Sequence, residues 1–340
     1  MSDVVPEARG RGRRAVTVVI DPAAADALAP LLDLWRRDRG VRLVPWSSVA
    51  DADPQQLRAL AEDADAVLVV GDRRRSPRTV LPGPVLTTGD GRVVPAAWLP
   101  ATTAADLARF AATAVAVHQR AGGPAGGDTA ASVPPAPGTS RTLAVLGERH
   151  PRFDRLAERI VRIGAEVGDP GVRVRRATAY ELRREELVEL LATGPALGVY
   201  VGHGRPVGWV GYAGTRAHHF ADAVARAGSQ PAAAVVSLTC QTASRRRTGL
   251  SFAEALPLRG VAAATLGAVT STVHTGNARW ALRIAHEVGT ASTIGNLVAR
   301  VAPHDPHAAT YRLLGDPTAP LLDAPAAREE HHPHPLEEAS

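Results

Sequence analysis

The feature that most constrains the fold of this chain is the alternation of short apolar segments with longer amphipathic ones. Ala15–Ile20 and Ala66–Val70 are continuous apolar runs rich in Val, which are typical of strands buried on both faces of a parallel sheet. Between them, residues 23–39 repeat leucine at the spacing of one helix face, and Val41–Trp46 forms another strand. Strands and helices in this alternation predict a doubly wound α/β layer.

The same alternation returns in the second half of the chain. Thr142–Leu146, Ala196–Val201 and Ala232–Leu238 read as apolar strands with helical segments between them. We therefore expect two α/β subdomains, which span residues 14–120 and 141–323. The segments outside them are rich in Gly, Pro, Ala, Arg, Glu or His, so we expect disorder or a flexible linker there: residues 1–13, 121–140 and 324–340.

The composition limits which cellular compartment and which classes of binding partner we expect. The 39 basic residues are all arginine, and the net charge is +5, but the arginine clusters are short, scattered and not interleaved with aromatic side chains. We expect a solvated surface rather than a nucleic-acid site. No apolar run reaches the ~18 residues of a membrane span, and Ala15–Ile20 ends too soon for a signal peptide. Cys240 is the single cysteine, so no disulfide forms within the chain, and we expect a cytoplasmic protein.

We expect no cofactor and no metal. The turn after Ile20 contains no glycine-rich cradle for a phosphate. The tail histidines His331, His332 and His334 could bind a metal weakly, but a solvated polar tail is the simpler interpretation.

Two of the apolar strands end abruptly in residues that carry chemistry. Ala196–Val201 leads into a glycine turn that holds His203, and Ala232–Leu238 leads into Cys240. Ligands of open α/β sheets bind outside the carboxyl ends of the strands, so neighbouring strands would bring the imidazole and the thiol together. An imidazole can take the thiol proton, and the thiolate is a nucleophile. Taken singly, each residue has a plainer interpretation: His203 as an ordinary turn residue and Cys240 as a small buried hydrophobic side chain.

The glycine after the histidine has a predicted role of its own. Gly204 has no side chain, so a substrate backbone can approach the imidazole closely. The main-chain N–H groups of Gly204 and Cys240 are then candidates for an oxyanion hole.

The residues around both strand ends resemble the gingipain-type cysteine peptidases of the caspase-like clan, which are related to the CHAT peptidases. The stretch Val199–Arg205 followed by Trp209 is similar to their histidine motif, and Val235–Cys240 is similar to their cysteine strand. The likeness spans roughly residues 15–320. Further matching stretches are Val67–Asp72, Val93–Phe110, Ser251–Leu256 and Leu313–Pro317.

The resemblance implies a caspase-like fold of two side-by-side α/β subdomains with mostly parallel sheets and the dyad in the second. By position, Glu148 matches the acid that orients the histidine in some members; a solvated loop glutamate is the alternative. Asp154 lies near the acid that binds a basic P1 side chain, the one before the scissile bond, in gingipains; a favourable charge at a helix N-terminus is the alternative. Trp209 and Trp280 are candidates for substrate contacts, and Trp280 has the alternative of a core position.

We therefore expect a cysteine endopeptidase that cleaves a protein or peptide through an acyl-enzyme on Cys240, in limited regulatory proteolysis. The alternatives are a CHAT-type signalling or defence peptidase and a catalytically idle binding scaffold. A basic P1 residue is favoured, because the candidate pocket acids are Glu148 and Asp154. The alternative is an acidic P1 residue, which would need a buried arginine, and Arg205 or the loop Arg245–Arg247 is then the candidate. The three arginines of the loop Arg245–Arg247 are expected to stay in water, since burying three like charges together is costly. The sequence leaves the oligomeric state open.

Overall fold

The computed structural model describes residues 15–48, 54–121, 142–167, 172–226 and 228–321. The segments predicted to be disordered or to form a linker, residues 1–13, 121–140 and 324–340, lie outside these ranges, apart from Ala121.

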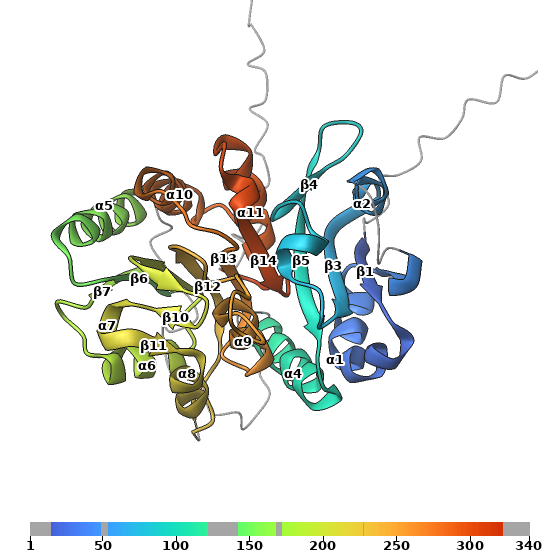
Figure 1. Cartoon of the computed structure of the whole chain (residues 1–340), viewed down its shortest axis with the longest axis horizontal. Coiled ribbons are helices and arrows are strands. Elements are labelled where there is room, and N and C mark those ends of the chain that lie inside the picture. Colours follow the sequence, from blue (N-terminus) through green and yellow to red (C-terminus); the bar gives the residue numbers. More distant parts are fainter. Residues whose placement is uncertain (1–14, 49–53, 122–141, 168–171, 227, 322–340) are drawn as a thin grey trace, which may run out of the picture.

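One continuous sheet of eleven strands crosses the molecule (Figure 1). Its path, from one edge to the other, is β2 (Val41–Pro45), β1 (Ala15–Ile20), β3 (Ala64–Asp72), β5 (Val93–Ala101), β14 (Tyr311–Gly315), β13 (Ala262–Ala268), β12 (Ala232–Leu238), β8 (Leu197–Val201), β6 (Thr142–Gly147) and β7 (Arg173–Thr178), with β4 (Val85–Thr87) paired to β5. The two halves run in opposite directions, because β14 is parallel to β5 but antiparallel to β13. The two predicted α/β layers therefore lie side by side within one sheet.

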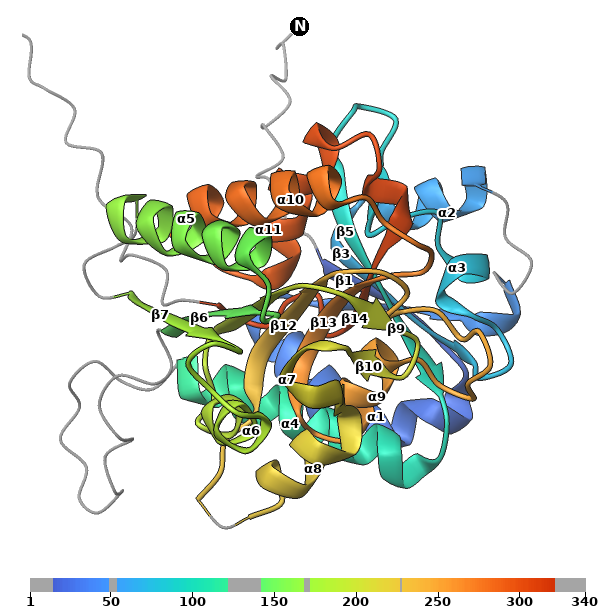
Figure 2. The same ribbon diagram turned by 60° about the vertical axis from the view of Figure 1, so that its left-hand side comes forward.

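Helices cover both faces of this sheet. They are α1 (Pro22–Asp38), α2 (Pro54–Ala61), α3 (Pro77–Val80), α4 (Ala104–Ala121), α5 (Pro151–Val167), α6 (Arg184–Ala192), α7 (Gly211–Gly214), α8 (Ala217–Val224), α9 (Phe252–Leu258), α10 (His274–Glu287) and α11 (Ile294–Val301). Figures 1 and 2 place α5, α10 and α11 on one face and α4, α6, α8 and α9 on the other. Within the described ranges, no helix combines the length and apolarity that a membrane crossing requires.

The two strands that carry the candidate residues are neighbours in the middle of the second half. β8 and β12 are parallel, with Val201 opposite Leu238, and every residue of both strands is buried. Complete burial explains why both segments are apolar throughout rather than alternating. Their carboxyl ends lie next to each other, as the sequence predicts.

A small three-stranded antiparallel sheet, which the sequence analysis did not predict, follows the end of β8. It consists of β9 (Gly204–Arg205), β10 (Gly208–Trp209) and β11 (Thr215–Arg216), paired antiparallel. Trp209 stacks on Tyr200 with ring centroids 4.4 Å apart and donates a hydrogen bond to Ser237 Oγ at 2.9 Å. The indole is only 2% exposed. The prediction that Trp209 contacts substrate is therefore wrong: this ring anchors the hairpin in the core.

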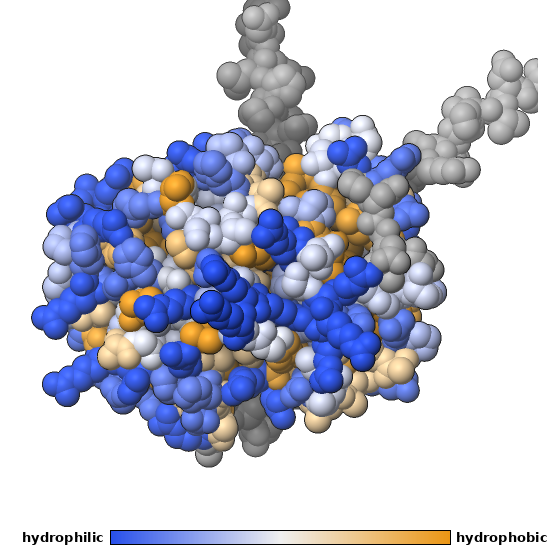
Figure 3. All heavy atoms as spheres, in the orientation of Figure 1, coloured by the Kyte–Doolittle hydropathy of each residue, from blue (hydrophilic) through white to orange (hydrophobic). Residues whose placement is uncertain are grey.

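Space-filling atoms show the character of the surface on the side seen in Figure 1. A band of hydrophilic side chains crosses the middle of this face, and the apolar side chains form separate spots beside it (Figure 3). Apart from Arg312, every arginine among the described residues is exposed or half-buried, as expected for a charged side chain.

Candidate active site

The parallel register of β8 and β12 brings the two candidate residues together. His203 and Cys240 each lie two residues beyond the last register pair, Val201 and Leu238. Gly204 fits closely against this end of β12: a Cβ atom built on it would meet Thr239 Oγ1 at 2.5 Å and the Cys240 carbonyl oxygen at 2.7 Å. The backbone after His203 thus lies against the backbone of Cys240, and glycine at 204 is a steric requirement.

The imidazole of His203 lies on the surface, between an aromatic ring and an arginine. Phe153 meets it edge to face, with ring centroids 5.4 Å apart. Arg152 donates a hydrogen bond from its guanidinium to Nε2 at 2.8 Å. Nε2 is therefore an acceptor in this arrangement, and the proton of the neutral ring is on Nδ1.

Glu148 holds the turn that carries the histidine. Its Oε2 accepts a hydrogen bond from the main-chain N–H of His203 at 2.6 Å, and the hydroxyl of Tyr200 donates to the carbonyl oxygen of His203 at 3.2 Å. The sequence predicted that Glu148 orients the imidazole. The carboxylate instead bonds the backbone of the histidine, and none of the described contacts joins it to the ring. Burial raises the pKa of Tyr200 well above its ordinary value, and the charge of Glu148 adds to this shift.

The thiol of Cys240 is held by the loop that follows β13. The main-chain N–H of Thr272 donates to Sγ at 3.4 Å, and the Thr272 hydroxyl lies 3.6 Å from Sγ. Asn277 donates to that hydroxyl at 3.0 Å and accepts from the hydroxyl of Tyr311. Sequence reasoning missed Thr272 and Asn277, although the polar residues that follow a third neighbouring strand, β13, were a usable signal.

The residue after the thiol adopts an unusual backbone conformation. Gln241 has a φ of 60°, which is in the left-handed region that side chains other than glycine and asparagine seldom adopt. Its N–H donates to the carbonyl oxygen of Thr270 at 3.0 Å, and this bond joins the loop after β12 to the loop after β13. Such conformations cluster at functional sites.

Two further predictions about substrate contacts need correction. Asp154 accepts hydrogen bonds from Arg176 at 2.6 Å and from the Thr178 hydroxyl at 3.3 Å, so its carboxylate ties α5 to β7. It is not free to bind a basic side chain of substrate. Trp280 is 1% exposed and packs on Tyr311, with ring centroids 4.8 Å apart. It is a core residue rather than a wall of an open pocket.

The arginine loop beyond the cysteine is only partly in water. Arg246 and Arg247 are exposed, as predicted. The side chain of Arg245 is 11% exposed and forms a bidentate ion pair with the fully buried Glu254, with Nε–Oε2 and Nη2–Oε1 distances of 2.8 and 2.6 Å. A buried carboxylate thus draws one of the three guanidinium groups out of water.

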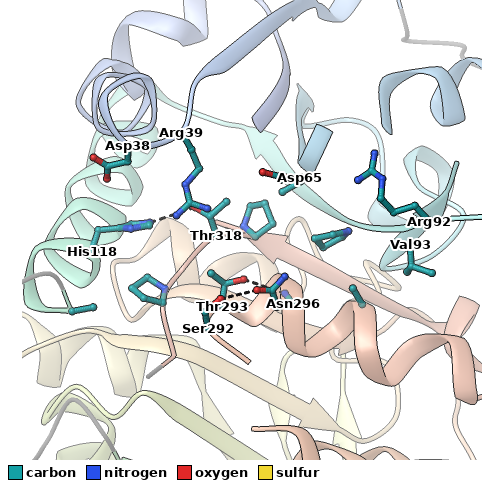
Figure 4. Close-up of a pocket in the computed structure, with 16 residues that line it drawn as sticks. Asp38, Arg39, Asp65, Arg92, Val93, His118, Ser292, Thr293, Asn296 and Thr318 are labelled. Carbon is teal, nitrogen blue, oxygen red and sulfur yellow. Dashed lines mark hydrogen bonds between the residues drawn. The ribbon is translucent and has the colours of Figure 1, made fainter. Parts of the chain in front are cut away.

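The structure has a small cavity beside the loop that holds Cys240 and a larger one away from both candidate residues. A cavity of about 240 Å³ next to Thr272 and Tyr311 contains the carboxylate of Asp305. A larger one of about 640 Å³ is lined by Arg39, Arg92 and the start of α11 (Figure 4), and neither His203 nor Cys240 lines it. The first three amides of α11 already donate to Ala319, Pro317 and Thr293, so they are unavailable to a ligand.

The close fit of Gly204 leads to a first prediction. Gly204→Ala should lower kcat/KM on a peptide substrate by about 10²-fold, because its Cβ pushes the Cys240 main chain away from the imidazole, and displacements near 1 Å have effects of this size. Gly249→Ala is the matched control, since a Cβ there meets no atom within 4 Å. Equal activity of the two variants would show that the close approach does not matter.

Comparisons with known proteins bear on the family and the fold. Residues 164–322 match the family model described as peptidase family C25. No curated protein matches the chain. Among solved structures, the Arg specific cysteine proteinase gingipain R has 15% identity and a TM-score of 0.68, covering 94% of this chain and 80% of its own. The complex of Porphyromonas gingivalis RgpB pro- and mature domains has 13% identity and a TM-score of 0.66, covering 90% and 79%.

The resemblance inferred from the two strand-end motifs is confirmed by the family match and by the shared fold. The mixed α/β architecture with its mostly parallel central sheet is the caspase-like fold of gingipain R. In family resemblance and in fold the chain is therefore gingipain-like, and it is a cysteine-type peptidase.

Proposed function

We propose that this peptidase is an endopeptidase that cleaves through an acyl-enzyme on Cys240, with His203 as its proton acceptor and donor. The observation that carries the proposal is the register of β8 and β12: His203 and Cys240, the chain's single cysteine, each follow the paired ends of these neighbouring strands by two residues. The Thr272 N–H on Sγ adds a donor that stays in contact with a thiolate.

The proposed steps follow from these positions. Sγ attacks the carbonyl carbon of the scissile peptide bond, and the thiol proton passes to His203. The C–N bond then breaks, the leaving amine takes that proton from the imidazole, and a thioester remains on Cys240. Water, deprotonated by His203, attacks the thioester and releases the acid and the free thiol. The N–H groups of Gly204 and Cys240 stay the candidates for the oxyanion hole.

Asp154 and Glu148 were the reasons to expect a basic P1 residue, and both are occupied by other groups. The proposed substrate is therefore defined at this stage only as a protein or peptide. Limited regulatory proteolysis in the cytoplasm stays a prediction, and CHAT-type signalling or defence is one setting for it.

The experiment compares thiol reactivity with turnover. In His203→Ala, we expect iodoacetamide labelling of Cys240 at pH 7 to slow by about 10-fold or more, because no imidazole accepts the thiol proton. Cleavage of a fluorogenic tetrapeptide library should fall together with labelling. His286→Ala is the control, since that exposed side chain on α10 has no described partner.

The opposite result is equally informative. Unchanged labelling and turnover in His203→Ala would separate the thiol from the imidazole and remove the dyad. If the unmodified protein cleaves no member of the library, the alternative of an idle binding scaffold is favoured instead.

A further inference from the structure

A cluster of basic side chains surrounds the exposed edge of the proposed dyad. Phe153 is at its centre: His150, His203 and His274 each meet this ring, with centroid separations of 5.8, 5.4 and 5.5 Å. The guanidinium carbon of Arg152 lies 4.5 Å from the centroid of the same ring. One arginine and three imidazoles therefore border a single small area that includes the His203 side chain of the proposed dyad.

Two nitrogen atoms in this cluster are left without a partner. Arg152 Nε and His274 Nδ1 are both shielded from solvent, and neither makes a hydrogen bond to a described residue. Buried polar atoms are normally paired, and an orphaned donor is costly unless a ligand completes it. Arg152 Nε is a donor that can pair only with an acceptor.

The local charge is positive. Burial lowers the pKa of His274, and the neighbouring Arg152, His150 and His203 lower it further, which shows that the surrounding groups repel another positive charge. No described carboxylate forms an ion pair with Arg152. An anion here would therefore gain from the guanidinium of Arg152, which no described carboxylate neutralises.

Two of the three acidic side chains nearby are already committed to hydrogen bonds. Glu148 accepts from the His203 main chain and Asp154 from Arg176. On the other side of the thiol, Asp305 lies 3.5 Å from Arg279 and accepts from the His307 N–H at 2.7 Å. Glu148 and Asp154 are therefore unavailable for a basic side chain of substrate without losing a partner, whereas Asp305 Oδ2 is shielded from solvent and accepts no hydrogen bond from a described residue.

We propose that Arg152, assisted by His150 and His274, forms a subsite that selects an acidic substrate side chain at P1. The proposal rests on the proposed peptidase function of Cys240 and His203, and it replaces the expectation of a basic P1 residue. A carboxylate bound here accepts from Nε and from a second N–H of the Arg152 guanidinium, the geometry in which arginine pairs with carboxylates most strongly.

The same arginine links recognition to catalysis. Without substrate, Arg152 donates to Nε2 of His203 at 2.8 Å and so occupies the lone pair that a base needs. A substrate carboxylate competes for that guanidinium and frees Nε2. An acidic P1 residue should therefore raise kcat as well as lower KM, whereas a pocket that only binds would change KM alone.

Three tetrapeptide substrates that differ only at P1, with Asp, Asn or Arg, test the proposal. For the unmodified protein we expect kcat/KM to be about 10- to 100-fold higher for Asp than for the isosteric Asn, with Arg cleaved least. In Arg152→Gln the Asp to Asn ratio should fall to about one, while Asn cleavage persists. Arg155→Gln, on the exposed side of α5, is the matched control and should keep the ratio.

The failure of this subsite is distinguishable from failure of the peptidase function. Cleavage that needs Cys240 but shows no Asp preference, or an Arg preference, overturns the subsite alone. A ratio that survives in Arg152→Gln overturns the role of Arg152.

A second measurement does not depend on turnover. Peptide aldehydes that end in Asp or Asn are tested for protection of Cys240 against iodoacetamide. We expect the Asp aldehyde to protect Cys240 about 10-fold more strongly than the Asn aldehyde. This difference should be lost in Arg152→Gln and lost or reduced in Arg152→Lys. Equal protection by the two aldehydes contradicts the subsite.

Discussion

Cys240→Ala should lower kcat on any cleaved peptide by at least about 10³-fold, because the acyl-enzyme cannot form without the sulfur. The chain has a single cysteine, so no second thiol can substitute for it. The fold should survive. Cys240 is only partly buried, and its sulfur contacts Thr272 through weak hydrogen bonds of 3.4 to 3.7 Å, so we expect the free energy of unfolding to change by about 1 kcal/mol or less.

Turnover and urea unfolding, measured on the same preparations, check this result. In the unmodified protein, iodoacetamide should remove activity in step with labelling of one thiol. Cys240→Ser keeps the size of the side chain but has a much weaker nucleophile, so it should be nearly as inactive as the alanine variant. Full turnover in either variant would place the chemistry elsewhere on the molecule.

Much of the fold could be predicted because its signals are local. Complete burial on both faces leaves an uninterrupted apolar run, which is how Leu197–Val201 and Ala232–Leu238 became visible as strands. The polar residues where these runs stop mark the edge at which ligands bind. Positions 203 and 240 were proposed from that rule together with the resemblance of both strand ends to the gingipain-type peptidases.

The partners of the side chains were the part that could not be predicted. Asp154 looked free in the sequence, but β7 brings Arg176 to it. Trp209 looked like a surface ring beside a catalytic turn, but the unpredicted hairpin folds it onto Tyr200. Both contacts depend on tertiary packing between segments far apart in the chain, and the hydrophobic periodicity of the sequence does not predict them.

Arg245 shows the same limit for charge. The prediction that three adjacent arginines stay in water assumed that all three guanidinium groups would have to be buried together. In the structure only Arg245 leaves the water, and the carboxylate of Glu254 compensates its charge. Conversely, the contact of Arg152 with His203 spans 51 positions in the chain, and only the proximity of α5 to the end of β8 reveals it. A specificity residue can therefore lie in a segment whose sequence reads as an ordinary helix start.

Glu254 is expected to be the most sensitive position for stability. Its carboxylate is fully buried and accepts from Arg245, from the Trp98 indole N–H at 3.0 Å, and from the N–H and hydroxyl of Ser251 at 2.9 and 2.8 Å. Glu254→Ala removes the acceptor and leaves a largely buried guanidinium without a counter-charge. We therefore expect the free energy of unfolding in urea to fall by about 3–5 kcal/mol.

A double-mutant cycle tests whether the pair is the cause. Arg245→Leu with Glu254→Leu replaces both charges by apolar groups, and a joint replacement of this kind should cost much less than the sum of the single changes, because no uncompensated charge stays buried. Additive losses, or a loss below about 1 kcal/mol in Glu254→Ala, would contradict this account. Because Arg245 lies in the loop that follows Cys240 and also donates to the Arg73 carbonyl oxygen, losing the pair should slow turnover too, through the turn that holds the thiol.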